Sequence, residues 1–559
     1  MSPVQILDQL LKHDLPRSIE IFAPELVLCA TIVLMLLVRM LDSRRRIPMQ
    51  LVALVGATLV FLGVFTQFVV LKGTADPAIL EPLSKLWCVT PSGVGTSGTY
   101  FTGLLTHDLF AVFLRLGLSL FLVLLIALTI LSGVPDREDA QDFYTLIFGA
   151  TLGMMMAVGA NHLLMLFLTV EMMSLPSYLV VAFQKGKRRA SEASLKYVIY
   201  GAGAAGVMLY GISLIAGLLG TADLSLISQR AILVLEPAGL AQNSATALCL
   251  MLGILMVLAG LAFKLALVPF HFWCPDAFEG ALSEVGAFLS VAAKLASFGL
   301  LIRFVLAFHG NAQVLHQISL FVGIALGVAG IISTTYGNLA AYQQTNLKRL
   351  LAYSTIAQSG YTVMAVSAML VLLSAQTGTI PDATEQAARC VEGMLYYLVI
   401  YLFMNLSAFG CVALLRNELF SEDLESYRGL FQGRVPVKIA CLCLAISFFS
   451  LIGLPPLGGF FGKFMIFSSL YSAGSLHWFL WVVLAFGALN TVLSVFYYVR
   501  VLKAIFLMER RTRPVRYELQ GVSATYLVLV TLPVLALGAT PMMADLSEAT
   551  RQVALLLLH

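Results

Sequence analysis

Charged residues are scarce in this chain of 559 residues. Lys, Arg, Asp and Glu make up 11% of it, whereas a typical soluble domain has about a quarter. Hydrophobic residues reach 59%, and the mean hydropathy is +0.91. This composition excludes a soluble domain of useful size and predicts an all-α polytopic membrane protein. The net charge of +4 is small, and the basic residues lie in short loops between apolar stretches, which indicates topology and not nucleic-acid binding.

Several motifs are also missing. The eight cysteines form no Cys-x-x-Cys pair and no ferredoxin-like run, so iron–sulfur ligation is not expected. No Gly-rich phosphate loop follows a strand, which argues against a nucleotide site. The first twenty residues are of mixed polarity and lack a signal-peptide pattern. If the protein takes part in redox chemistry, we expect another chain to hold the cofactors.

Long apolar stretches dominate the chain, and fourteen of them approach the ~20 residues that a helix needs to cross a bilayer. They cover residues 21–40, 50–71, 108–132, 142–160, 162–183, 194–219, 246–270, 285–308, 316–336, 346–372, 391–415, 437–472, 478–502 and 522–540. We therefore expect about 14 transmembrane helices.

Basic residues gather in the loops that follow odd-numbered spans. They are Arg44 to Arg46, Lys185, Lys187 to Arg189, Lys348, Arg349, Arg416, Arg428, Arg434, Lys438, Lys503, Arg510, Arg511, Arg513 and Arg516. The positive-inside rule places these loops in the cytoplasm. Because the number of spans is even, both termini are then expected on the outer side.

Two spans are interrupted, the seventh at Pro269 and the twelfth at 453–459. Proline removes a backbone donor and frees a carbonyl one turn earlier, here near Leu265. The two breaks are five spans apart, which predicts two inverted five-helix repeats with a site near the midplane; two unrelated kinked helices are the alternative. The expected units are 1–141 with helices 1–3, 142–308 and 309–505 as the repeats, and 506–559 as helix 14 and tail.

Ionisable residues within the spans are expensive in lipid and normally face a polar interior. Six of them are candidate site residues: Glu171, Lys196, Lys264, His271, Lys294 and Lys463. Acids and bases alternate among them and form no metal-ligand cluster, so no metal site is expected and a proton path is the better interpretation. Lys463 follows the second break and is expected to be the counterpart of Lys264 in the second repeat.

Each candidate also has a plainer interpretation. Glu171, Lys264, Lys294 and Lys463 could be structural groups satisfied by hydrogen bonds, and His271 could be a hydrogen-bonded core histidine. Lys196 begins a span and could extend to the interface.

Three further charges near the ends of spans are expected to be structural. Glu284 is expected to be a solvated charge at the end of its span, while Lys348 and Arg349 would anchor the start of the tenth span.

Several stretches between residues 140 and 505 resemble the antiporter-like membrane subunits of proton-translocating NADH–quinone oxidoreductase (respiratory complex I). They are Val170 to Tyr178, Ser194 to Tyr197, Phe263 to Trp273, Asn346 to Ser354, Tyr396 to Gly410 and Gly453 to Lys463. Ser-Leu-Pro-Ser-Tyr after the glutamate favours the subunit N type over its sister subunits.

The resemblance implies a role for each candidate. Glu171 would pair with Lys264 as a charge switch, and Lys196 would lie near the proton input. His271 would bridge to Lys294, the central carrier, and Lys463 would be the carrier on the exit side.

The resemblance also implies partners and a location. NADH, FMN, iron–sulfur clusters and quinone would be bound in partner subunits and none in this chain. A sister antiporter-like subunit and small membrane subunits would be its neighbours in a bacterial plasma (inner) membrane.

Three departures from the family pattern stand out. Gln358 occupies a position where the family commonly has histidine, 282–284 replaces a usual Ala/Thr-Pro stretch, and loop 72–107 is longer than expected. Other functions also stay open: a subunit of a related cation/proton antiporter or membrane-bound hydrogenase, a scaffold that has lost pumping, and, with less support, a solute carrier.

Overall fold

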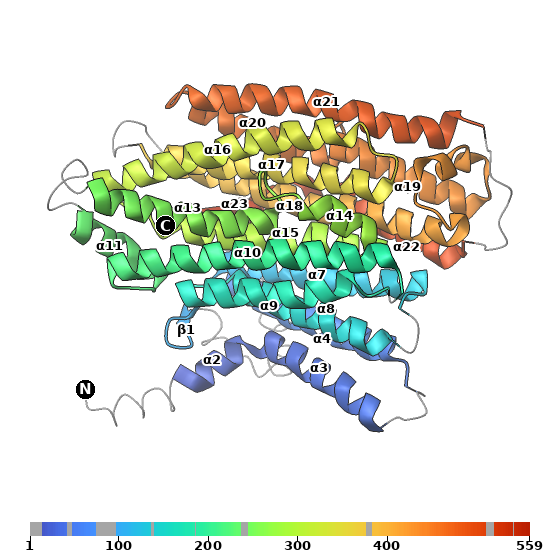
Figure 1. The fold of residues 1–559 in the computed structure, drawn as a ribbon, viewed down its shortest axis with the longest axis horizontal. Helices are drawn as coiled ribbons and strands as arrows, with labels where there is room; N and C mark the ends of the chain where they lie inside the picture. Colours follow the sequence, from blue (N-terminus) through green and yellow to red (C-terminus); the bar gives the residue numbers. More distant parts are fainter. Residues whose placement is uncertain are drawn as a thin grey trace.

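The structure is a computed structural model that describes residues 14–41, 47–73, 97–135, 139–184, 186–235, 244–375, 383–509, 519–539 and 541–558. Within these ranges, 13 helices are long and apolar enough to cross a membrane. Most of them lie roughly side by side along one common direction (Figure 1). The predicted all-α polytopic architecture is confirmed.

The first half of the chain contains one hairpin and eleven helices among its described residues. These elements are α2 (Leu15–Ile21), α3 (Ala23–Leu41), α4 (Met49–Lys72), β1 (Gly98–Tyr100), β2 (Leu105–His107), α7 (Leu109–Ser132), α8 (Ala140–Ala157), α9 (Leu163–Val181), α10 (Arg188–Leu219), α11 (Leu224–Leu235), α13 (Ser244–Leu265), α14 (Trp273–Gly280) and α15 (Ser283–Leu306). The antiparallel strands pair Gly98 with His107, and Thr106 N donates to Gly159 O at 2.7 Å.

The second half is helical throughout its described ranges. Its elements are α16 (Gln313–Ala341), α17 (Leu347–Leu373), α18 (Ala383–Leu419), the 3-10 turns η3 (Leu424–Tyr427) and η4 (Leu430–Gln432), α19 (Val435–Ile452), α20 (Gly458–Gly474), α21 (Phe479–Leu507), α22 (Gly521–Ala539) and α23 (Met542–Leu558).

All fourteen predicted spans coincide with a helix or with a broken pair of helices. The fourth, α8, is the least apolar, because polar side chains such as Gln141, Asp142 and Tyr144 occupy its first turns. The sequence did not predict α2, α11 or α23. Loop 72–107 holds the β hairpin; its residues 74–96, and the basic residues Arg44 to Arg46, Lys185, Arg510, Arg511, Arg513 and Arg516, lie outside the described residues.

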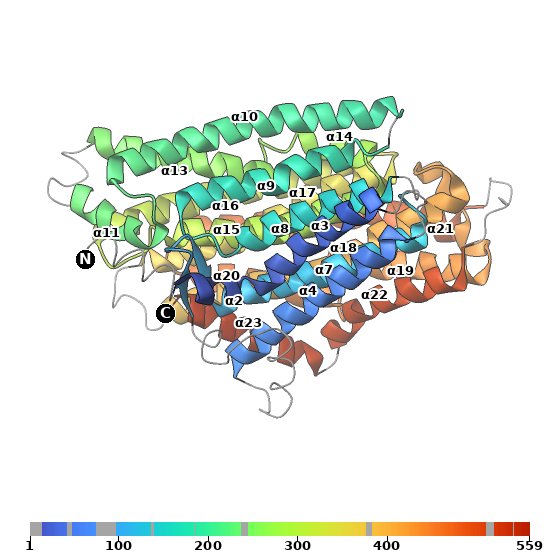
Figure 2. The same ribbon diagram turned by 90° about the horizontal axis from the view of Figure 1, so that it is seen from below.

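Three helices form the centre of the bundle. The apolar windows of α15 and α17 are fully buried and that of α18 is 89% buried, whereas those of α3, α10 and α21 are only 28% buried. Figures 1 and 2 show α15, α17 and α18 in the interior and α3, α10 and α21 at the edges. A polar side chain on a central helix must therefore be satisfied by protein groups or by enclosed water.

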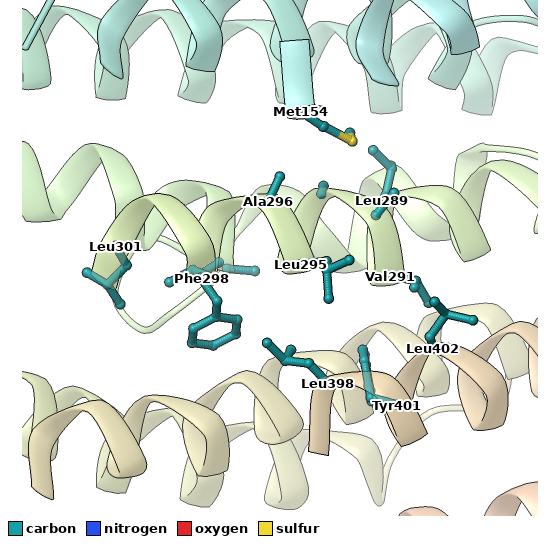
Figure 3. Packing of buried hydrophobic residues seen from close by; sticks show 14 of the residues in the cluster. Met154, Leu289, Val291, Leu295, Ala296, Phe298, Leu301, Leu398, Tyr401 and Leu402 are labelled. Atoms are coloured by element: carbon teal, nitrogen blue, oxygen red, sulfur yellow. The ribbon is translucent and has the colours of Figure 1, made fainter. Parts of the chain in front are cut away.

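Apolar side chains fill most of the space around α15. Figure 3 shows Leu289, Val291 and Leu295 of this helix between Met154 of α8 and Leu398, Tyr401 and Leu402 of α18. Each of these residues is at most 6% exposed. Against such a lining, a charged group on α15 stands out as an exception that needs its own explanation.

A buried ion pair fixes the peripheral helix α3 to the bundle. Arg115 Nε of α7 lies 3.2 Å from Glu25 Oε1, and both side chains are 0% exposed. Arg115 also donates to Tyr100 Oη at 2.7 Å and to Met155 O at 3.2 Å. One guanidinium thus joins α3, β1, α7 and α8.

Replacing one partner of this pair should destabilise the protein. Glu25→Ala leaves a buried cation unpaired, so we expect a loss of about 3–5 kcal/mol in the free energy of unfolding. The double variant Glu25→Met/Arg115→Met removes both charges and should recover most of that loss. Thermal melting of the purified protein measures all three; equal melting temperatures for native protein and Glu25→Ala would contradict the assigned role.

Candidate functional site

The first break separates α13 from α14. The helix stops at Leu265, and Ala266 adopts a left-handed φ of +54°, a conformation that costs a non-glycine residue about 1–2 kcal/mol. The irregular stretch runs past Pro269 to the start of α14 at Trp273. Its backbone is partly satisfied from a neighbouring helix, since Val268 N donates to Ser333 Oγ of α16 at 3.0 Å.

Lys294 supplies a further partner for this break. It lies in the middle of α15 and is 1% exposed, and its ammonium donates to the carbonyl of Leu265. This is the carbonyl that the sequence predicted to be free, because Pro269 has no amide hydrogen to offer it. A buried cation and an unpaired buried carbonyl thereby satisfy each other.

The second break repeats this arrangement with a different lysine. Helix α19 ends at Ile452 with Gly453 at φ +93°, a conformation that favours glycine, and α20 begins at Gly458. Lys463 Nζ donates to Leu451 O at 2.8 Å and to Ile452 O at 3.2 Å. Its ammonium also lies 4.4 Å from the centre of the Tyr361 ring.

The two interrupted spans each carry a lysine, but on different sides of the break. Lys264 precedes the first break, whereas Lys463 follows the second. In its contacts Lys463 matches Lys294, because each donates to carbonyls at the end of an interrupted helix. The sequence predicted the free carbonyl near Leu265 but not which lysine would donate to it, nor the carbonyls that Lys463 contacts.

Lys264 is enclosed by aromatic rings. It is 3% exposed, and its ammonium lies 5.4, 5.7 and 5.5 Å from the ring centres of Tyr178, Tyr197 and Phe263. Such rings stabilise a cation by about 2 kcal/mol when it is desolvated. Glu171 of α9 is half-buried and acts on Lys264 electrostatically, but the described residues include no ion pair within 4 Å between them.

His271 lies in the irregular stretch but bridges no lysine. The residue is 2% exposed, and its ring centre lies 4.4 Å from those of Phe272 and Tyr336. Neither ring nitrogen has a hydrogen-bond partner among the described residues. The predicted bridge between His271 and Lys294 is therefore not formed in this conformation, and the Leu265 carbonyl takes the place next to Lys294.

Lys196 lies in the third turn of α10, because this helix begins at Arg188 and not at residue 194. Its side chain is 41% exposed and pairs with Asp276 at 2.8 Å and Glu192 at 2.9 Å. Arg349 binds the same Asp276 at 2.7 Å. These charged groups line an open pocket of about 210 Å³ beside α14.

Sequence reasoning missed Asp276, although a signal was present. It is a charged residue shortly after the Pro269 break, between the candidate residues His271 and Lys294. In the structure it joins Lys196 of α10 to Arg349 of α17 and so connects the first break with the central helices.

A chain of polar side chains runs along α17 and α18 to the second break. Gln358 Nε2 donates at 3.0 Å to Leu451 O, which also accepts from Lys463, and Tyr397 Oη donates to Gln358 Oε1 at 2.5 Å. Further along, Asn405 Nδ2 donates to Tyr401 Oη at 2.8 Å. The α18 members recur every four residues and therefore share one face of the helix.

Cys274 lies between the two breaks. It is 0% exposed at the start of α14, and its thiol donates to the Ala352 carbonyl of α17 at 3.9 Å. Tyr401 of α18 donates to Thr355 Oγ1 of α17 at 3.2 Å. These contacts place one polar interior between the two breaks, across α14, α17 and α18.

Glu284 is buried and not at the surface. It is 0% exposed, so the solvated end charge predicted from the sequence is wrong. The reason is that α14, α17 and α18 pack around the first turn of α15 and cover it. Lys348, 3% exposed at the start of α17, donates to Ala281 O at 2.6 Å and pairs with Glu422 at 2.8 Å.

Comparison with known proteins agrees with this arrangement. Residues 160–494 match the family described as NADH:quinone oxidoreductase/Mrp antiporter, TM. The chain is 39% identical to NADH-quinone oxidoreductase subunit N of Anaeromyxobacter sp. (strain Fw109-5) over 448 residues, which cover 77% of this chain and 80% of that one.

Solved structures share the fold. One chain of respiratory complex I from Thermus thermophilus with bound Aureothin is 25% identical with a TM-score of 0.68, covering 93% of this chain and 98% of that one. A chain of the Mrp complex from Dietzia sp. DQ12-45-1b is 19% identical with a TM-score of 0.72, covering 96% and 97%, and shows the fold alone. This chain therefore belongs to the NADH:quinone oxidoreductase/Mrp antiporter transmembrane family, as a member of the subunit N type.

Proposed function

We propose that this chain moves protons across the membrane as a subunit of an NADH–quinone oxidoreductase, driven by quinone reduction in other subunits. The observation that carries the proposal is Lys294, a cation held at the centre of a fully buried helix by a carbonyl from a broken one. A charge at such depth costs a few kcal/mol or more and is normally functional. An ammonium can release and rebind a proton, which is the chemistry that translocation needs.

The candidate residues divide into successive roles in this proposal. Lys196 lies at the open pocket beside Asp276 and would take up protons. Glu171 would bias the charge of Lys264 from across the aromatic cage, and Lys294 would be the central carrier. Lys463 would be the carrier on the exit side.

His271 would join Lys264 to Lys294 through a conformation in which the irregular stretch shifts. Its two unpartnered nitrogens leave it able to accept and donate at the same time.

The proposal also includes topology and location. The helices of 142–308 and 309–505 would form two inverted repeats, with one break in each. The loops rich in Lys and Arg would face the cytoplasm and both termini the periplasm of a bacterial plasma (inner) membrane.

Partner subunits complete the proposed assembly. NADH, FMN, the iron–sulfur clusters and quinone would be bound in those subunits, with no cofactor in this chain. The exposed apolar faces of α10 and α21 would contact lipid, a sister antiporter-like subunit or small membrane subunits.

Two other functions remain as alternatives with distinct consequences. A related cation/proton antiporter or membrane-bound hydrogenase shares the fold, but the 39% identity to a subunit N favours the quinone oxidoreductase. In a scaffold without pumping, the contact of Lys294 with the Leu265 carbonyl would serve only to stabilise the break, and removing the lysine would not change the number of protons pumped per electron. Co-purification with peripheral redox subunits tests the first alternative, and the Lys294→Ala variant described next tests the scaffold.

Removing the central carrier should abolish coupled activity. In membrane vesicles with the native complex, we expect Lys294→Ala to lower proton pumping and NADH–quinone turnover by about two orders of magnitude, a typical loss for a proton-transferring group. Lys503→Ala, which removes an exposed lysine of α21, is the matched control and should behave as native. Unchanged pumping per electron in an assembled Lys294→Ala complex would favour the scaffold.

Gln358 should act through its hydrogen bonds to the Leu451 carbonyl and the Tyr397 hydroxyl, and not by carrying a charge. Gln358→Leu leaves Tyr397 and the Leu451 carbonyl short of a partner, at a cost of about 1–3 kcal/mol. We expect coupled turnover to fall roughly tenfold, since each ~1.4 kcal/mol is a factor of ten. Gln358→His can donate to the carbonyl and accept from the tyrosine, so it should keep most activity; equal losses in both variants would contradict this role.

A further inference from the structure

Glu284 is the least satisfied charged group in the interior. It lies in the first turn of α15 and is 0% exposed, and neither carboxyl oxygen has a hydrogen-bond partner among the described residues. The neighbouring Ser283 hydroxyl is also buried without a partner in the described part of the chain. An isolated buried carboxylate is costly, so a carboxyl in such a place needs a proton or a nearby cation.

Lys348 of α17 is a cation that contacts the backbone close to Glu284. Its ammonium donates to Ala281 O, three residues before Glu284, at 2.6 Å. It interacts electrostatically with Glu284 and forms an ion pair with Glu422 Oε2 at 2.8 Å. Lys348 is therefore bonded to the carboxyl group of Glu422 and to the backbone three residues before the free carboxyl group of Glu284. Arg416 Nη1 also lies 3.9 Å from Glu422 Oε1.

These three side chains form a gradient of exposure. The side chain of Glu422 is 16% exposed and that of Lys348 is 4% exposed, whereas Glu284 as a whole is 0% exposed. The backbone fixes the outer end, because Leu347 N donates to Glu422 O at 2.9 Å and Asn346 pairs with Asp423. The line thus runs from the edge of the protein inward, through groups that can each take and release a proton.

The inner end of the line lies on the helix that holds Lys294. Ten residues separate Glu284 from Lys294, a rise of about 15 Å along α15. Tyr144 of α8 is the other titratable group that interacts electrostatically with Glu284. Beyond Lys348, α17 continues to Thr355 and Gln358 and so borders the same polar interior.

We propose that Glu422, Lys348 and Glu284 form a second proton-uptake line into this chain, separate from Lys196, with Glu284 as the residue that loads the interior. The inference rests on the proposed function and adds an uptake route to it. The proton passes from Lys348 to the free carboxyl group of Glu284, and Lys348 is reprotonated from the outer side through Glu422.

A purely structural role is the competing explanation. A negatively charged carboxylate in the first turn of a helix is stabilised by the helix dipole, and a neutral amide of the same shape largely loses this stabilisation. A proton carrier has a different signature, because an amide cannot carry a proton while a shorter carboxyl can. The pair Glu284→Gln and Glu284→Asp therefore separates the two explanations.

The test uses the whole complex in sealed vesicles. Glu284→Gln should lower the rate of NADH-driven pumping about tenfold or more, and Glu284→Asp should restore much of it. Glu425→Gln, which removes an exposed carboxyl paired with Arg428 on the same side, should match the native complex. Redox-induced infrared difference spectra should show a buried carboxyl signal in the native complex that is absent from Glu284→Gln.

Each outcome decides the matter. Native pumping rate in an assembled Glu284→Gln complex, or equal losses in the Gln and Asp variants with an unchanged infrared spectrum, would overturn the inference. If Glu284→Gln fails to assemble, Lys348→Gln tests the same line by the same rate measurement, and a native rate overturns it. Lys294→Ala is measured in parallel to test the proposed function separately. Normal pumping in Lys294→Ala would reject both the proposed function and the second uptake line. A loss of pumping in Lys294→Ala, with normal pumping in the Glu284 variants, would reject only the second uptake line.

Discussion

The contact between a lysine ammonium and the carbonyls of a broken helix is the interaction on which the rest of the structure depends. A buried ammonium and an unpaired buried carbonyl would each cost several kcal/mol alone. Lys294 meets the carbonyl of Leu265, and Lys463 meets those of Leu451 and Ile452. Each break would be an isolated defect in the absence of its lysine.

The surrounding bundle buries these contacts and holds them in place. Helices α15, α17 and α18 are almost completely buried, and apolar side chains pack around most of α15 (Figure 3). Several polar groups in this interior are linked by hydrogen bonds, such as Gln358 with Tyr397 and Lys196 with Asp276. Since low polarity strengthens electrostatic interactions, a proton gained at one group can bias its neighbours.

Much of the fold followed from hydropathy, and less of the site did. Span positions, both breaks and the free carbonyl near Leu265 were predictable, because proline and the length of an apolar run act locally. The burial of Glu284 and the link from Gln358 to the Leu451 carbonyl were not, since they depend on which helices pack against α15 and α17. Tyr178 and Tyr197 carried no signal beyond their residue type, because their contacts with Lys264 join groups far apart in the sequence, whereas the charge of Asp276 beside the first break was a signal that went unused.

In the proposed mechanism the lysines at the breaks release their protons and do not merely fill a hydrogen-bonding position. Lys294→Arg tests this most directly, because a guanidinium can still donate to the Leu265 carbonyl but keeps its proton in proteins. The measurement is protons pumped per electron, and the rate of pumping, in vesicles that contain the assembled variant complex. The account predicts intact assembly with pumping lost. Pumping at the native ratio and rate in Lys294→Arg would show that only a fixed charge is needed there.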